Sequence, residues 1–546
     1  MPEAHETSES DLSAPLAAPK MPLRLRSSSL DHQQAPSEPR RIGVAALACL
    51  VFFSVSGGPF GFEEAIGAGG AGWTILGCLL MPLIWSVPEA LMTAELSSAF
   101  PEASGFSAWV NEAFGPFMAF LCGALSWVSG VTDNAVYPVL LLDYIQQAVR
   151  RDLGPKNDDD AGGGGLDIPL AVQWVFILVF TVGFTYLTWR GLDITGNVAI
   201  ALTVACLAPF AVYVAFAAGS LQPGRWLNFR RVEDVDWRTL VNVLFWNYNY
   251  FDSSSAWAGD VQGPRTFPVA MVYALLIIFL TYLLPTLAAT GTAPRDADYC
   301  DGCFTNLANN VAGGTALGYW ILAAAAISCI GLFIAEMSSD AFQLMGLAER
   351  GILPSALARR SKYGTPTIAT LLSAVGVVAL SKMSFTEIIE VENALYVFAE
   401  VIEFAAFVYL RRYRADVPRP FKVPYLDGWR SAFLFVPASL FLFFVLIICS
   451  SLTLILTGAV TVGTCAFYVF LCAARRYRWF DFRPIEPGWS TDRDPFLIRM
   501  ILTALSVDHP GEFLLHSTVL DDEQSEGQVD SSDRGRALYD SSEASP

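Results

Sequence analysis

The stretch from Val51 to Glu64, VFFSVSGGPFGFEE, constrains the fold of this chain more than any other. It starts as an apolar helix, meets Gly57-Gly58-Pro59, and ends in two adjacent carboxylates, Glu63 and Glu64. Because glycine weakens a helix and proline removes a backbone donor, we expect the helix to break here. Inside a bilayer, the freed backbone groups are tolerated only where protein or a water-filled cavity satisfies them. The stretch therefore predicts a discontinuous membrane helix whose broken part binds a ligand.

Composition supports a membrane location. The 546 residues are 53% hydrophobic, and the apolar residues come in long blocks. Such blocks are typical of an all-α protein that crosses a bilayer many times. We expect a transport domain at 41–475, between an N-terminal tail at 1–40 and an acidic tail at 476–546. Twelve transmembrane helices are predicted, at about 42–66, 73–98, 116–148, 169–189, 194–218, 240–262, 268–291, 316–346, 366–382, 385–410, 432–450 and 453–473.

Charge and histidine content exclude several classes of function. The net charge of -18 argues against a nucleic-acid partner. All four histidines lie in the tails, so the predicted helices contain no imidazole for a nucleophilic triad or a metal site. We therefore expect no enzyme activity, no cofactor and no metal. Cys300 and Cys303 form a CxxC in a polar loop, and whether they form a disulfide stays open.

The distribution of basic residues predicts the orientation. With twelve helices both tails lie on the same side of the membrane. The loops around 350–362, 411–422 and 475–478 share the side of Arg41 and hold about twice as many basic residues as the opposite loops. Both termini should therefore be cytoplasmic, and we take the plasma membrane as the location.

The sixth predicted helix repeats the theme of the first. LFWNYNYFDSSSAWAGD, from Leu244 to Asp260, is interrupted by Asn247, Asn249, Asp252 and three serines, with the helix expected to resume at Ala256. Such side chains compete for backbone hydrogen bonds and favour an opened turn. Breaks in the first helix of two successive five-helix groups indicate an inverted-repeat transporter. The two repeats would be 42–218 and 240–410, with two extra helices within 432–473.

Many carboxylates fall within the predicted helices, which contain essentially no lysine or arginine at depth. Each buried charge costs about 2.5–3.5 kcal/mol even on a lenient scale, so a transported cation is the natural counter-ion. We expect Asp252 and Glu336 to contact the cation, with Glu63, Asp133 and Glu403 as further candidates. We expect capping, gating or structural roles for Glu89, Glu95, Asp260 and Asp340.

Aromatic residues near the two breaks suit the same chemistry. Ring faces attract an ammonium group and exclude water from it. Core or lipid-facing packing is the commoner fate of any single aromatic residue. The candidates for an aromatic box are Phe60, Trp127, Trp246, Tyr250, Phe251 and Trp257.

Several long motifs then carry a family resemblance. In order along the chain they are SGGPFGFEEAIG, PLIWSVPEALMTAELSSAFPE, SWVSGVTDNAVYPVLLLDYI, IAEMSSDAFQLMGLAERGILP and KYGTPT. Between about 43 and 424 the chain resembles the polyamine-uptake branch of the amino acid/polyamine/organocation superfamily. The resemblance implies the ten-helix inverted-repeat fold of the bacterial leucine transporter, with two helices added. It also implies a substrate site formed by Gly57, Gly58, Phe60 and Gly61 of the first helix and Asn247, Asn249, Tyr250, Phe251 and Asp252 of the sixth.

The chain departs from part of this pattern. Some proton-coupled relatives carry a lysine in the fifth helix, but ITGNVAIALTVACLAPFAVYVAFAAG has none. Ser338 and Ser339 could serve as sodium ligands, yet they fall close to the end of the eighth helix. We expect a proton as the coupling ion, carried by a carboxylate, with sodium as the alternative.

Together these observations predict an alternating-access importer of putrescine- or spermidine-like cations. A carrier of neutral or cationic amino acids in the same fold is the first alternative, because the Gly57–Gly61 amides could hold a carboxylate. A receptor or partner subunit that does not transport is the alternative from another class, and its acidic tail would be the functional part.

Overall fold

The computed structural model describes residues 42–102, 104–153, 168–191, 197–293, 299 and 302–484. These residues belong to a single unit, Arg41–Pro546. The tail at 1–40, the chain from residue 485 onward and Cys300 lie outside the described residues. Cys303 is disulfide-bonded.

The described part is helical, and its β-structure is limited to isolated bridges between Ile42 and Val261 and between Arg360 and Pro366. Short 3₁₀ helices and one π-helical turn, Pro82–Ser86, connect the longer elements. The α-helices are α1 (Val44–Val55), α2 (Glu63–Met81), α3 (Val87–Ala99), α4 (Phe106–Phe114), α5 (Pro116–Asn134), α6 (Val136–Leu153), α7 (Leu170–Trp189), α8 (Asn197–Ala217), α9 (Trp237–Trp246), α10 (Thr266–Thr292), α11 (Cys303–Ala312), α12 (Ala316–Glu349), α13 (Thr367–Leu380), α14 (Phe385–Tyr413), α15 (Val436–Ile448) and α16 (Ser451–Arg476).

The first two predicted helices meet inside α2. Gly70 has a non-helical backbone (φ 70°, ψ 175°) that divides α2 into two parts. A side chain would be strained at this φ, and its Cβ would lie 3.0 Å from Arg230 Nε. The predicted range 42–66 thus covers α1 and the start of α2, and 73–98 covers the rest of α2, the π-helical turn and α3.

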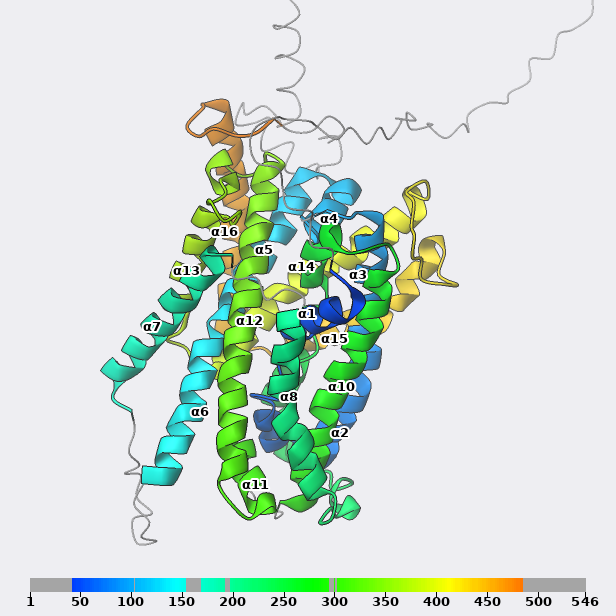
Figure 1. The fold of residues 1–546 in the computed structure, drawn as a ribbon. Coiled ribbons are helices and arrows are strands. Elements are labelled where there is room, and N and C mark those ends of the chain that lie inside the picture. The colour runs from blue at the N-terminus through cyan, green and yellow to red at the C-terminus, as the bar shows by residue number, and fades with distance from the viewer. Residues whose placement is uncertain are drawn as a thin grey trace, which may run out of the picture. The chain divides into compact units, whose positions relative to one another are not determined.

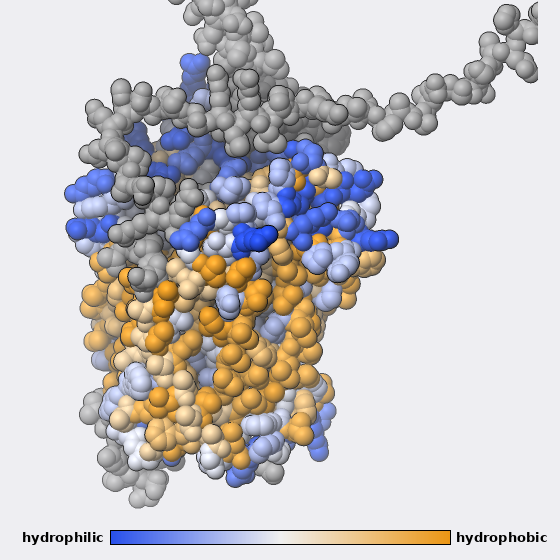
Figure 2. All heavy atoms as spheres, turned by 45° about the vertical axis from the view of Figure 1, so that its right-hand side comes forward, coloured by the Kyte–Doolittle hydropathy of each residue, from blue (hydrophilic) through white to orange (hydrophobic). Residues whose placement is uncertain are grey.

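Seven of the described helical segments are long and apolar enough to cross a membrane, with Glu63–Ala99 taken as one. An eighth is added if Gly428–Leu434 and Val436–Ile448, bent by 47°, form one span. Figure 2 shows hydrophobic residues covering the middle of the described surface, with hydrophilic residues toward its ends. Large exposed hydrophobic residues lie on α7, α10, α13, α15 and α16. This belt is the surface that a bilayer would cover.

The helices that carry the two breaks lie inside the bundle. Helix α1 packs against α8, α10 and α12, as Figure 1 shows. Helix α9 packs against α2 and α14, and α5 lies between α12 and α14. Local sequence sets the helix ends: Asp236 caps α9 by accepting from Thr239 N at 3.1 Å, and Ser384 with Glu387 forms a capping box on α14.

Candidate functional site

The first break runs from Ser56 to Phe62, between α1 and α2. Gly57 and Gly61 have φ of 61° and 76°, which L-residues with a side chain rarely adopt. Ser328 of α12 donates from Oγ to the Gly57 carbonyl at 2.8 Å, so a neighbouring helix satisfies a backbone group freed by the break. The α-helix resumes at Glu63 and not before, because the positive φ at Gly61 cannot belong to a right-handed helix.

The second break follows α9 and spans residues 247–251, with Tyr250 at a φ of 70°. Helix resumes at once as the 3₁₀ helix Asp252–Asp260, so the expected restart at Ala256 was wrong. Ser253 and Ser254 each donate from Oγ to the carbonyl three residues earlier, at 2.8 and 2.5 Å. The serines thus satisfy the carbonyls of the break instead of keeping the chain open.

Four carboxylates gather where α3, the start of the 3₁₀ helix Asp252–Asp260 and α14 meet. They are Glu89, Asp252, Glu400 and Glu403, and we call them the α14 acid cluster. Oxygens of the first three lie within 4.8 Å of one another, close enough to contact one small cation. Tyr396 Oη lies 2.6 Å from Asp252 Oδ1 and 2.9 Å from Glu89 Oε1.

Three more carboxylates, Asp133, Glu336 and Asp340, lie between α5 and α12; we call them the α12 acid cluster. Asp133 accepts from Trp246 Nε1 and from Tyr137 Oη, each at 2.6 Å. Oε2 of buried Glu336 has no hydrogen-bond partner, so it can accept a donor from a bound ligand.

Two tyrosines link the second break to α14. The rings of Tyr250 and Tyr396 are stacked, with centroids 4.5 Å apart and planes at 17°. The Tyr250 hydroxyl lies 2.7 Å from Ser129 Oγ of α5. Asn249 Nδ2 lies 3.5 Å from Glu392 Oε1, and Glu392 is fully buried. The break is therefore held between α5 and α14.

The remaining sequence candidates lie apart from the acid clusters. Glu63 is fully buried and accepts from Tyr144 Oη of α6 at 2.5 Å and from Phe304 N of α11 at 3.4 Å. Asn247 donates to the carbonyl of Val243 within its own turn.

Among the described residues, the aromatic candidates make ring contacts with other residues and not with one another. Phe60 makes edge contacts with Tyr144 and Phe210, with centroids 5.7 and 5.3 Å apart. Trp127 points to α13, where its Nε1 donates to Ser373 Oγ at 3.0 Å. Trp257 packs in the small cluster around Cys49, Leu50 and Ile334, and Phe251 is fully buried. Only Trp246, through Asp133, and Tyr250, through Tyr396, join the acids.

Glu89, Glu392 and Glu400 lie beside predicted cation contacts, although they were not named as such contacts from the sequence. Glu89 accepts at 3.2 Å from the N–H of Asp252, the first residue of a 3₁₀ helix, which is a capping contact of the expected kind and also places Glu89 beside Asp252. The signal for Glu392 was that it stands next to Asn393 and is followed by the apolar run Ala394–Ala399 of α14. Which acids meet depends on helix rotation, which spacing alone does not fix.

Glu95 corrects the view that the buried acids lack basic partners. It forms ion pairs with Arg411 and, at 3.2 Å, with Arg419, and it accepts from Val423 N at 2.8 Å. Arg411 lies in the last turn of α14 and Arg419 follows that helix. Both residues therefore lie outside the predicted span 385–410. Glu95 is therefore a structural ion-pair partner and not a free cation site.

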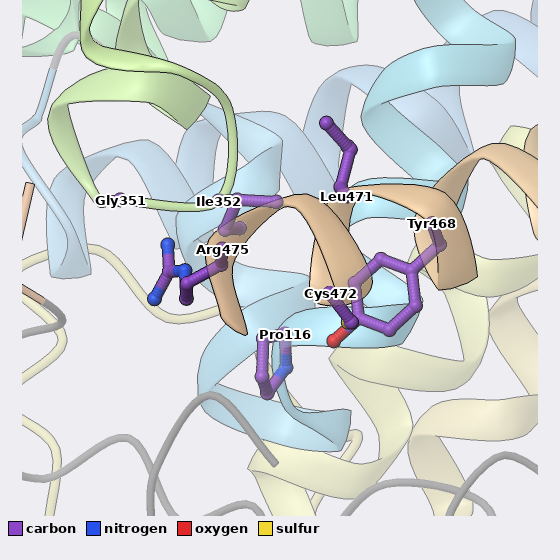
Figure 3. A pocket seen from close by; sticks show the side chains of 7 residues that line it. All are labelled: Pro116, Gly351, Ile352, Tyr468, Leu471, Cys472 and Arg475. Atoms are coloured by element: carbon purple, nitrogen blue, oxygen red, sulfur yellow. The ribbon is translucent and has the colours of Figure 1, made fainter. Parts of the chain in front are cut away.

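Two hollows in the structure do not contain the acids. The pocket in Figure 3, between the start of α5 and the end of α16, has a volume of about 10 Å³, room for one water. A groove of about 640 Å³ runs between α14 and α15 and is lined mainly by apolar side chains such as Val401, Phe404 and Phe435. The buried acid clusters are therefore the better candidate for binding a cation.

Comparison with known proteins places the chain in a family. Residues 42–472 match the model of the amino acid permease family. The chain belongs to the amino acid permease family. That membership confirms the resemblance carried by the sequence motifs and identifies the chain as a multi-pass membrane transporter rather than an enzyme.

Several relatives within this permease family are similar over most of their length. A probable polyamine transporter of Arabidopsis thaliana is 43% identical over 460 residues, which cover 84% of this chain and 92% of the relative. The polyamine transporter PUT1 of Oryza sativa subsp. japonica is 43% identical over 84% of each chain. The polyamine transporter RMV1 of Arabidopsis thaliana is 45% identical over 70% of this chain and 76% of its own.

Proposed function

We propose that this permease imports polyamines by alternating access, with putrescine- or spermidine-like cations as substrates. The observation that carries the proposal is the pair of buried acid clusters beside the second break, where carboxylate oxygens of Asp252 and Glu336 have no hydrogen-bond partner. Buried carboxylates need a cationic partner or a proton, and a polyamine supplies several ammonium groups. The polyamine transporters among its relatives support this substrate class.

In this proposal Asp252 and Glu336 hold ammonium groups of the substrate. Asp133 lies beside Glu336 and orients the site through Trp246 and Tyr137. Glu403 is the further candidate at the end of the α14 acid cluster, and Glu63 at the outer side of the first break. The methylene chain would lie against the ring of Tyr250, which stacks on Tyr396 beside the α14 acid cluster.

The finer architecture is also part of the proposal. We propose twelve transmembrane helices, as five-plus-five inverted repeats at 42–218 and 240–410 with two extra helices. The non-helical backbone at Gly70 supports counting Glu63–Ala99 as parts of two spans. We further propose cytoplasmic tails at 1–40 and 476–546, a plasma-membrane location, and import coupled to protons, with sodium as the alternative ion.

An amino-acid substrate has less support at the first break. A substrate carboxylate would need free N–H groups there. The N–H groups of Ser56 and Gly57 donate to the Phe52 carbonyl at 2.9 and 3.0 Å, and Gly58 N donates to Ser56 Oγ at 3.3 Å. Several donors that an amino acid would use are thus already occupied.

Uptake of radiolabelled putrescine into polyamine-uptake-deficient cells that express this chain tests the proposal. Spermidine, arginine and leucine serve as competitors, and a protonophore tests the driving force. We expect saturable uptake that spermidine blocks and leucine does not. Uptake of leucine or arginine without uptake of putrescine would instead identify an amino-acid carrier. Truncation after Arg478 should leave uptake intact, whereas a receptor would lose its output.

A further inference from the structure

The α14 acid cluster places four carboxyl groups in one enclosed space. Glu89, Glu400 and Glu403 are 0% exposed, and Asp252 is 1% exposed. They come from three separate elements, α3, the 3₁₀ helix Asp252–Asp260, and α14. Four like charges at this separation without water would repel one another strongly, because burial removes the screening that water provides.

Several carboxylate oxygens of the cluster have no hydrogen-bond partner. Both carboxyl oxygens of Glu400 lack a hydrogen-bond partner, as do Oε2 of Glu89, Oδ2 of Asp252 and Oε2 of Glu403. Buried ionised oxygens almost always accept hydrogen bonds. Oxygens without such a bond therefore argue against four carboxyl groups that are all charged.

Basic side chains do not neutralise the cluster. Among the described residues, no ion pair involves any of its four members. The basic residues that follow on α14 begin at Arg411, and Arg411 binds Glu95. The other titratable groups that face the cluster are Tyr396 of α14 and Cys122 of α5, whose Sγ lies 3.6 Å from Glu403 Oε1. Neither is a base.

The contacts of Tyr396 point to a bound proton. Its hydroxyl lies within hydrogen-bond distance of both Asp252 Oδ1 and Glu89 Oε1. One hydroxyl carries a single hydrogen and can donate to only one of them. The other contact is a hydrogen bond only if that carboxyl group carries a proton and donates it to the tyrosine oxygen.

We propose that the α14 acid cluster is the binding site of the exchangeable proton that drives uptake, with Glu400 as its central group. The inference rests on the proposed function and extends it to named residues. Protonation allows α3, the second break and α14 to pack as they do here, and loss of the proton drives them apart. In the α12 acid cluster, Trp246 and Tyr137 already donate hydrogen bonds to Asp133. Glu336 of that cluster and Asp252 keep the role of holding the substrate ammonium groups, and Glu400 holds the proton.

Proteoliposomes with the purified full chain separate substrate transport from proton coupling. Radiolabelled putrescine is the probe, and valinomycin with equal potassium on both sides removes the membrane potential. Counterflow measures exchange, which needs no net proton movement. Accumulation driven by a pH gradient measures coupling. With one coupled proton, a gradient of about one pH unit supports about tenfold accumulation.

Glu400→Gln mimics a permanently protonated acid and is the decisive variant. We expect it to keep counterflow and to lose the roughly tenfold accumulation. Glu400→Asp keeps a titratable group and should restore accumulation, which a merely structural role of Glu400 would not predict. Glu390→Gln is the control on the same helix, because Glu390 pairs with Arg238 and binds Ser450 N outside the cluster.

The outcomes distinguish the two proposals. If Glu400→Gln and Glu89→Gln both accumulate putrescine as the unmodified chain does, the cluster is not the coupling site, although the proposed function stands. Counterflow in the unmodified chain without accumulation overturns the proton coupling and this site together. Absence of counterflow in the unmodified chain overturns the polyamine function itself. Counterflow also reports folding, so a variant that fails to fold is recognised, and Glu89→Gln then decides.

Discussion

Gly130 of α5 lies directly against the carboxyl group of Asp340 of α12. A Cβ on Gly130 would lie 2.2 Å from Asp340 Oδ1, closer than any non-bonded atoms approach. Asn134, one turn further along α5, donates to Asp340 Oδ2 at 3.2 Å. The carboxyl group of Asp340 can therefore take this position only because residue 130 has no side chain.

Gly130→Ala should displace the Asp340 carboxyl group from Asn134 and destabilise the protein by about 1–3 kcal/mol, the usual cost of overpacking. Thermal unfolding of the purified protein measures the change. Gly183→Ala on α7 is the matched control, because no atom lies within 4 Å of a Cβ there. Adding Asp340→Ala should recover much of the loss in the double variant; additive losses would show that Asp340 is not the obstacle.

Asp252→Asn should lower the efficiency of putrescine uptake by about thirtyfold, since a buried charged partner is worth about 2 kcal/mol or more. Asp252 is 1% exposed and one of its oxygens has no partner. Initial uptake rates, normalised to surface expression, measure the effect. Asp427→Asn is the control, since that carboxyl group is exposed and pairs with Lys422. Unaltered uptake by Asp252→Asn would show that this carboxylate does not hold the substrate.

Gly57→Ala should abolish uptake while much of the protein still reaches the membrane. The substitution costs about 1–2 kcal/mol for the left-handed backbone alone. The added methyl group would also lie 2.5 Å from Leu332 Cδ1 and 2.7 Å from Ser328 Oγ. Gly458→Ala on α16, where no atom lies within 4 Å, should leave uptake unchanged. Comparable uptake by both variants would mean that the first break does not need this conformation.

Arg411→Met should destabilise the protein by about 3–5 kcal/mol, because it leaves the buried carboxylate of Glu95 without its closest partner. The exposed neighbour Arg412→Met should change stability by less than about 0.5 kcal/mol. Thermal unfolding in detergent compares the two. The double variant Glu95→Gln, Arg411→Met should be more stable than Arg411→Met alone, and the reverse order would contradict a pairwise role.

Local chemistry made much of the fold predictable. Apolar blocks long enough to cross a bilayer indicated the membrane helices, and the order of Gly57-Gly58-Pro59 indicated the first break. The second break was placed correctly at Asn247, but its end was not. Serine hydroxyls can either open a turn or tighten it, and the sequence does not say which.

The site was less predictable than the fold. Asp133, Asp252, Glu336 and Glu403 do lie in the acid clusters, whereas Trp127 turns toward α13. The sequence contains Glu89, Asp252 and Glu400, but Asp252 and Glu400 are 148 positions apart, and Glu89 and Glu400 are 311 positions apart. Their proximity therefore depends on how distant helices pack.

The sequence by itself determined that this chain enters a membrane, where its helices break, and that its buried groups are acids. These properties follow from local composition and backbone preference. Only the tertiary structure decided which acids share a space and which, like Glu95, meet an arginine. The reason is physical: the rotation and depth of each helix are set by packing against its neighbours, and a turn of one helix moves a carboxylate from one cluster to another.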